Sequence, residues 1–175
     1  MVRLSEPVGP ADHRMGTENA LVTLVQYGSY DCPHCRQALG VIEEIREKNE
    51  TPVQLIYRHF PDETPHSVSH RAAEAAEAAA RQGKFWEMHA HLLRNQNALD
   101  DANLLAYAAE LGLDVRKVAQ ELESGEHATV VRSQFQSGRT SGVHSTPTFF
   151  INGVRHDDYW DAETLSAAIQ QTISR

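Results

Sequence analysis

The chain has 175 residues and a mass of 19.5 kDa, and 41% of its residues are hydrophobic. This length and composition are enough for one well-packed domain with an inserted subdomain. The formal net charge of −8 argues against nucleic acid or an anionic membrane as the main partner. No run of about 18 apolar residues occurs, so no transmembrane helix is expected. Residues 1–16 are polar where a signal peptide needs an apolar core, so we expect a cytoplasmic protein, or a periplasmic or secreted one if a signal sequence was removed.

The first part of the chain, residues 20–63, predicts a βαβ unit after a polar, extended lead-in at 1–19. Short β-branched and apolar runs indicate two buried strands. Between them Pro33 suits a first helical turn, where its missing N–H is not needed. The expected elements are a strand at 21–27, a helix from 33 to about 49 and a strand at 53–57.

Residues 64–141 predict a helical insert. Thr64-Pro65 offers a cap followed by proline, and the alanine-rich stretch 72–80 has small side chains that allow close helix packing. The expected helices run from 64 to Gly83, from 85 to 93, from 101 to 111, from 114 to about 122 and from 126 to 140.

The last part of the chain, residues 142–175, returns to strand and ends in a helix. A strand at 148–151 is followed by Asn152-Gly153, a strong signal for a type I′ hairpin. Asp161 is the expected cap of the final helix, with Trp160 against Leu165 as a hydrophobic staple.

The two cysteines of the chain, Cys32 and Cys35, lie where the first predicted strand gives way to the first predicted helix. A helix N-terminus stabilises a thiolate over a thiol, and the thiolate is the form that attacks a disulfide. Two other interpretations stay open. A structural disulfide would close a very short loop and constrain the unfolded chain little. A zinc site would need histidines to complete it, since a second Cys-x-x-Cys is absent.

Three segments in this order resemble the DsbA-like thiol–disulfide oxidoreductases of the thioredoxin superfamily, over nearly the whole chain from about Asp12. The resemblance implies an α/β, thioredoxin-like fold, βαβ…ββα with a central mixed sheet and a helical insert. The segments are Cys32-Pro33-His34-Cys35 after a buried strand, residues 83–89 (GKFWEMH) in the insert, and residues 145–153 (STPTFFING).

The resemblance makes Cys32 the exposed nucleophile and Cys35 the resolving thiol. The predicted helix supports this, because Cys32 falls at its cap and Cys35 turns towards the body of the domain. Pro147 would be the family's cis-proline, placing the Thr146 backbone beside Cys32, where an extended substrate segment could pair with it. The alternative is an ordinary trans proline that opens a strand.

Pro33, His34 and Asp31 are the expected modulators of the cysteine pair. A donor or positive charge from His34 would stabilise the Cys32 thiolate and make the disulfide more oxidising, whereas the Asp31 carboxylate would oppose it. The alternative for His34 is a solvated surface histidine. Two departures from the family pattern are Gln26, where relatives often have a buried glutamate, and His144, just before Ser145, where a glycine is common.

The leading hypothesis is a thiol–disulfide oxidoreductase that acts on protein or peptide thiols and disulfides, with a redox partner dithiol and no bound cofactor. The alternatives are a non-catalytic binding module, with zinc on both cysteines and a histidine, and a reductase of small oxidised compounds or glutathione conjugates. A large apolar pocket between the insert and the thioredoxin core would favour the second alternative. Metal ligation by the pairs His66/His70 and His89/His91 is a minor alternative to ordinary structural roles.

Overall fold

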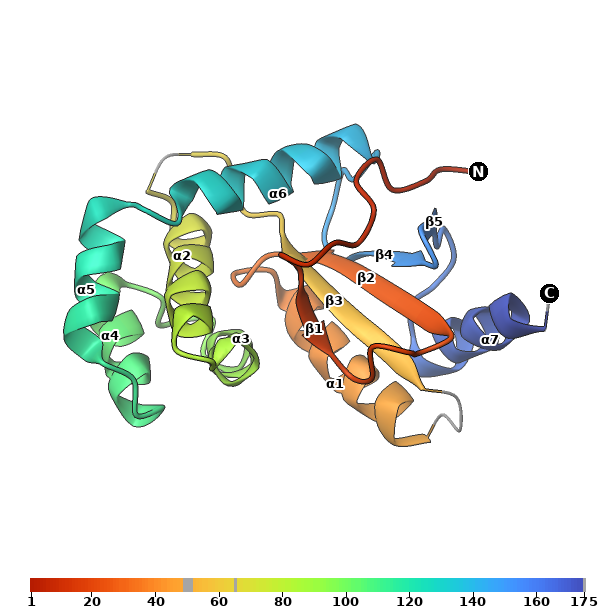
Figure 1. The fold of residues 1–175 in the computed structure, drawn as a ribbon, viewed down its shortest axis with the longest axis horizontal. Helices are drawn as coiled ribbons and strands as arrows, with labels where there is room; N and C mark the ends of the chain where they lie inside the picture. Colours follow the sequence, from red (N-terminus) through yellow and green to blue (C-terminus); the bar gives the residue numbers. More distant parts are fainter. Residues whose placement is uncertain (49–51, 65, 175) are drawn as a thin grey trace.

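The computed structural model describes residues 1–48, 52–64 and 66–174. In this part of the chain a five-stranded sheet is combined with seven helices (Figure 1). The elements are β1 (His13–Met15), β2 (Val22–Gly28), α1 (Pro33–Lys48), β3 (Val53–His59), α2 (Val68–Arg81), α3 (Phe85–Arg94), α4 (Asp101–Glu110), α5 (Val115–Ser124), α6 (Ala128–Thr140), β4 (Thr148–Ile151), β5 (Val154–Arg155) and α7 (Ala162–Ile173).

The sheet has the strand order β1-β3-β2-β4-β5. The two central strands, β2 and β3, run parallel, and the other neighbouring strands are antiparallel. β3 is buried along its whole length, and β2 at every residue except the half-buried Thr23, because both faces of the sheet are covered. This mixed sheet with flanking helices is the thioredoxin-like fold expected from the sequence.

Helices cover the two faces of the sheet differently (Figure 1). On one face α1 and α7 pack through a core that includes Leu24, Ile42 and Leu165. On the other face α6 approaches the sheet closely at Gly138, where a Cβ would lie 2.7 Å from the Phe60 ring. Any larger residue at 138 would push α6 away from the sheet.

Helices α2 to α6 lie in residues 64–141, the segment expected to be the insert, and the core of the insert continues into the sheet. α2 lies at its centre, with six alanines between positions 72 and 79 each at most 1% exposed. The same cluster of buried residues includes Tyr30, Cys35 and Tyr57, which come from the thioredoxin part of the chain. The insert therefore packs directly against the segment that carries the cysteines.

Most predicted elements are found within a residue or two, and two details differ. The first helix of the insert begins at Val68 and not at Thr64-Pro65, because Ser67 is its cap and accepts from the His70 N–H, while Thr64 bonds to Asp62. Pro65 and the expected end of the first helix at residue 49 lie outside the described residues. The lead-in contains a short strand, β1, which pairs with β3.

The Asn152-Gly153 hairpin is as predicted, with φ of 45° and 79° at its two central residues. Asp161 caps α7 by accepting from the Thr164 N–H, and Trp160 packs in the same cluster as Leu165. No helix in the described part of the chain is both long and apolar enough to cross a bilayer.

Candidate active site

The two cysteines occupy the first turn of α1 and differ in exposure. The Cys32 carbonyl accepts from the backbone N–H groups of Cys35 and Arg36, so Cys32 is the residue that caps the helix. Cys32 is half-buried, and Cys35 is fully buried. Both are free thiols. The arrangement leaves one sulfur within reach of a second molecule and shields the other.

The pKa of Cys32 is lowered to about 5, chiefly because the Cys35 side chain hydrogen-bonds to it. Burial acts against this, and the Thr146 side chain and the backbone N–H groups of Cys35 and His34 add to the lowering. These N–H groups belong to the first turn of α1, at the positive end of the helix dipole, which favours a negative charge. A thiol with this pKa is mostly thiolate at neutral pH.

The Cys35 thiol is held in its protonated form. Its pKa is raised by the hydrogen bond to Cys32 and by burial. The Ser29 N–H, which lies 3.5 Å from the sulfur, lowers the pKa and only partly offsets this rise. The two thiols thus share one negative charge, located on the exposed sulfur.

The loop that precedes β4 lies against Cys32. The Cys32 sulfur lies 3.3 Å from the Thr146 carbonyl, to which it donates when it is protonated, and the Thr146–Pro147 peptide bond is cis. Residues 145 and 146 are separated from the cysteines by more than a hundred positions in the sequence, and the pairing of β4 with β2 brings them here.

The predicted modulators occupy the rim of this site. His34 is exposed, with its ring 6.4 Å from that of Trp160 and its Nδ1 3.3 Å from Gln37 Oε1. Asp31 accepts from the Ser29 hydroxyl at 2.6 Å, and Pro33 is the first residue of α1. The contact that reaches Cys32 from His34 is its backbone N–H and not its imidazole. His144 is also exposed.

Gln96 is a site residue that the sequence did not reveal. It lies after α3 in the insert, and its Nε2 donates to the carbonyls of Tyr30 and Cys32 at 2.9 and 2.8 Å. The insert therefore ties down the loop that carries Cys32. A glutamine in a polar loop between two helices gives no sequence pattern that would predict such a role.

Below the cysteines the site is aromatic and contains unpaired polar groups. Gln26 is 2% exposed, and neither its Nε2 nor the Tyr57 hydroxyl has a hydrogen-bond partner among the described residues. The Tyr30 hydroxyl pairs with His89 Nδ1 at 3.0 Å, and burial lowers the pKa of His89 to about 3. Because Gln26 cannot titrate, it offers an amide where a carboxylate would accept a proton.

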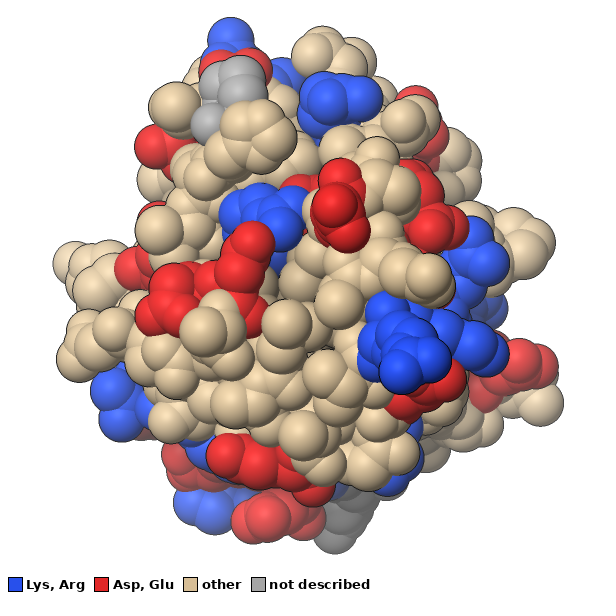
Figure 2. All heavy atoms as spheres, turned by 90° about the vertical axis from the view of Figure 1, so that its left-hand side faces the viewer, with Lys and Arg blue, Asp and Glu red and all other residues tan. Residues whose placement is uncertain are grey.

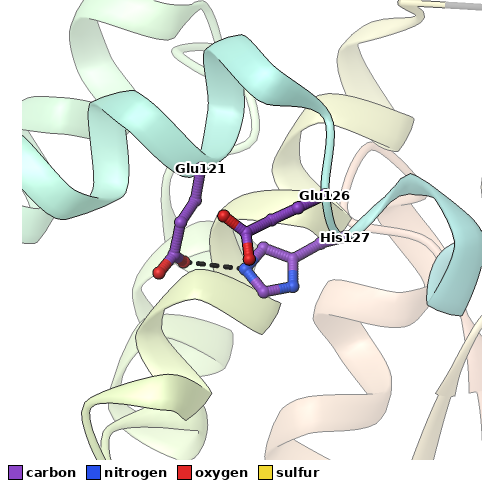
Figure 3. A group of neighbouring side chains, drawn as sticks. All are labelled: Glu121, Glu126 and His127. Atoms are coloured by element: carbon purple, nitrogen blue, oxygen red, sulfur yellow. Dashed lines mark hydrogen bonds and ion pairs between the residues drawn. The ribbon is translucent and has the colours of Figure 1, made fainter.

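The structure also brings together Glu121, Glu126 and His127 at the connection of α5 and α6, a group that the sequence did not indicate (Figure 3). His127 Nε2 lies 2.7 Å from Glu121, and Glu126 pairs with Arg81 at 3.3 Å. Each side chain thus has a partner within the protein. These contacts are sufficient to explain the group as a structural link between α5 and α6. Of the predicted histidine pairs, His70 binds Glu74, His91 binds Glu110 and His89 binds Tyr30. His66 precedes α2 and does not share a helix with His70, contrary to the prediction, because the helix begins only at Val68.

Comparison with known structures supports the architecture. A thioredoxin-like oxidoreductase from Silicibacter pomeroyi DSS-3 is 25% identical, with a TM-score of 0.84 over 95% of both chains. Oxidised BdbD from Bacillus subtilis has a TM-score of 0.87 over 99% of both chains at 18% identity. The alpha-DsbA1 of Wolbachia pipientis has a TM-score of 0.81 at 21% identity, covering 98% of this chain and 94% of its own. At 18% and 21% identity, the last two similarities show a shared fold.

The curated relatives are named as antiporters and are much longer than this chain. Na(+)/H(+) antiporter NhaA 3 of Salinispora tropica is 40% identical over 175 residues, which are 99% of this chain but 27% of that protein. The NhaA antiporter of Herminiimonas arsenicoxydans is 39% identical over 168 residues, again 27% of its length. The chain thus spans about a quarter of these relatives, and their name describes whole proteins that extend far beyond the match. The family model described as thioredoxin matches residues 9–171, so the chain belongs to the thioredoxin family, with the architecture of its DsbA-like oxidoreductases.

Proposed function

We propose that this protein is a DsbA-like thiol–disulfide oxidoreductase that exchanges disulfides with protein or peptide thiols through Cys32 and Cys35. The observation that carries the proposal is the asymmetry of the pair. One half-buried sulfur has a pKa lowered to about 5, and its fully buried neighbour keeps its proton. This division suits a nucleophile and a resolving thiol.

As a reductant, the Cys32 thiolate attacks one sulfur of a substrate disulfide and the other sulfur leaves as a thiolate. Cys35 then loses its proton and attacks the Cys32 sulfur, which releases the second substrate thiolate and forms the Cys32–Cys35 disulfide. Two electrons pass to the substrate. The reverse sequence oxidises a substrate dithiol, and a stabilised Cys32 thiolate favours this direction because it stabilises the reduced enzyme. The Thr146 backbone beside Cys32 is the proposed position for pairing with an extended substrate segment.

The test is single-cysteine substitution in a dithiol-peptide oxidation assay with glutathione as the redox buffer. Cys32→Ser is expected to abolish turnover. Cys35→Ser, incubated without glutathione with a disulfide-linked peptide dimer, is expected to accumulate a mixed disulfide between Cys32 and one peptide, visible as a mass increase that dithiothreitol removes. His144→Ser, on the exposed loop nearby, is the matched control and should retain turnover. Turnover by Cys32→Ser would overturn the proposal.

A further inference from the structure

A large cavity in the described part of the chain lies among the helices of the insert and away from the cysteines. It has a volume of about 810 Å³ and is bounded by α2, α4, α5 and α6, at the end of the molecule remote from α7 (Figure 1). Neither cysteine lines it. A cavity of this size accommodates a drug-sized molecule, and the disulfide exchange proposed above does not use it.

The wall of the cavity contains a buried carboxylate that is only half satisfied. The Glu74 side chain is 4% exposed, and its Oε2 lies 3.2 Å from His70 Nδ1 and 3.7 Å from Arg71 Nη1. Its Oε1 has no hydrogen-bond partner among the described residues and lies 3.9 Å from the position that a Cβ would take at Gly125, a residue that also lines the cavity. This oxygen is not one of the fully buried polar atoms that lack a partner, so a ligand in the cavity can reach it and donate to it.

Three of the five N–H groups of Arg71 bind other residues, and its nearest contact with Glu74 is the 3.7 Å ion pair with Oε2. Its Nε and Nη2 bind the two oxygens of Asp101 at 3.0 and 2.7 Å, and its Nη1 donates to the Leu122 carbonyl at 2.7 Å. The Oε1 atom of Glu74 therefore remains available to a ligand bound in the cavity.

The charges around the cavity favour a cation. Five carboxylates and two guanidiniums line it, an excess of three negative charges with histidine counted as neutral. The outer face of the insert shows both signs interspersed among uncharged side chains (Figure 2). The remaining wall is mixed: Leu105, Leu122, Val131 and Phe135 form an apolar part, and His66, His70, Ser124 and Gln136 add polar groups. A low-dielectric wall strengthens the attraction between a carboxylate and a bound cation.

We propose that this cavity binds a small organic cation, a protonated amine on an apolar body, with the amine on Glu74 Oε1 and the body against the side chains of α5 and α6. The charge-assisted hydrogen bond satisfies the buried carboxylate, and the apolar body is removed from water. This binding site is independent of the proposed disulfide exchange.

The test is isothermal titration calorimetry of the full chain with three probes of equal shape, 2-naphthylmethylamine, 2-naphthylmethanol and 2-naphthoate. We expect saturable binding of one amine per chain at pH 7, with the alcohol weaker by about tenfold or more, the factor associated with a charge-assisted hydrogen bond. The carboxylate probe is expected not to bind. Equal binding of all three probes, tighter binding of naphthoate, or no saturable binding of the amine would overturn the proposal.

Two matched variants locate the site. Glu74→Gln keeps the size and the acceptor for His70 but removes the charge, and should weaken amine binding by about tenfold or more. Glu123→Gln removes an exposed charge from the cavity rim and should change the affinity by less than about threefold at 0.15 M salt, because exposed charges are screened. Ala128→Trp, on the cavity wall, should abolish binding by filling the space and leave the circular dichroism and the alkylation of Cys32 unchanged. Equal effects of the two glutamine substitutions, or undiminished binding to Ala128→Trp, would contradict the assignment.

Discussion

Cys32 and Cys35 are three residues apart on one helix, yet their chemistry is opposite. The half-buried Cys32 is stabilised as a thiolate by the Cys35 thiol and by first-turn N–H groups, whereas burial and the same pairing keep Cys35 protonated. The His34 imidazole, the modulator expected from the sequence, is turned towards Gln37 and Trp160. The pair is therefore tuned mainly by its own geometry and by the backbone.

The alkylation of Cys32 should follow this geometry. In reduced protein, the rate with iodoacetamide is expected to rise with pH through a midpoint near 5 and to level off by neutral pH, because only the thiolate reacts. Cys35→Ala should shift the midpoint upwards, since it removes the largest stabilising contact. His34→Ala keeps the backbone N–H and should shift it less. A wild-type midpoint near 8.5, the value of an ordinary thiol, would contradict the assignment.

At the scale of elements, a buried ion pair is one of the contacts that anchor the N-terminal segment. Arg58 on β3 is 4% exposed and binds both oxygens of Asp12 at 2.8 and 2.9 Å. It also donates to the carbonyls of Glu6 and Pro7 and to the Tyr27 hydroxyl. This arrangement holds the lead-in against the sheet beside β1, and explains why a polar segment is ordered there.

Asp12→Ala is expected to destabilise the protein by about 3 kcal/mol, because it leaves a buried guanidinium without its counterion. Urea unfolding of the variant and of wild type measures the difference. Glu18→Ala, which removes an exposed carboxylate from the same segment, should change the free energy of unfolding by less than about 0.5 kcal/mol. A loss of unfolding free energy below about 1 kcal/mol for Asp12→Ala would show that the buried Arg58 guanidinium does not need Asp12 as its counterion.

At the scale of the whole molecule, the insert and the thioredoxin part share one core below the cysteines. His89 of α3 bonds to Tyr30, its ring lies 4.4 Å from that of Tyr57, and Gln96 reaches the Cys32 carbonyl. On the far side of this core Glu77 of α2 accepts from His13 and His59, and these two bonds hold its pKa well below the usual range despite burial. The buried polar groups thus join the two parts of the fold.

This shared core predicts a loss of stability on mild acidification. Burial lowers the folded pKa of His89 to about 3, so between pH 6.5 and 3 the unfolded chain binds a proton that the folded chain does not. The free energy of unfolding should therefore fall as the pH decreases below about 6.5. His89→Gln should flatten the decline between pH 6.5 and 5, because the contribution of Glu77 is lost only below its unfolded pKa near 4.3. His144→Gln, at an exposed histidine, should keep the wild-type slope, and an unchanged slope in His89→Gln would refute this explanation.

Local patterns in the sequence predict most of the fold, because they depend on neighbours along the chain. The apolar runs of β2 and β3, the helical spacing after Pro33, the Asn152-Gly153 turn and the Asp161 cap each contain their own signal. β1 has only three residues and no alternation, so its existence depends on pairing with β3. The start of α2 was missed because Ser67 and Thr64 are equally good caps by sequence, and Asp62 binds Thr64.

By itself, the sequence determined that two cysteines stand at the start of a helix after a buried strand, and that the elements follow in a thioredoxin-like order. Only the tertiary structure decided how deeply each sulfur is buried, which groups contact Cys32, that Gln96 holds its carbonyl and that Glu74 faces a cavity. The physical reason is that desolvation and hydrogen bonding depend on distances between segments far apart in the chain. A local pattern contains no information on those distances until packing brings the segments together.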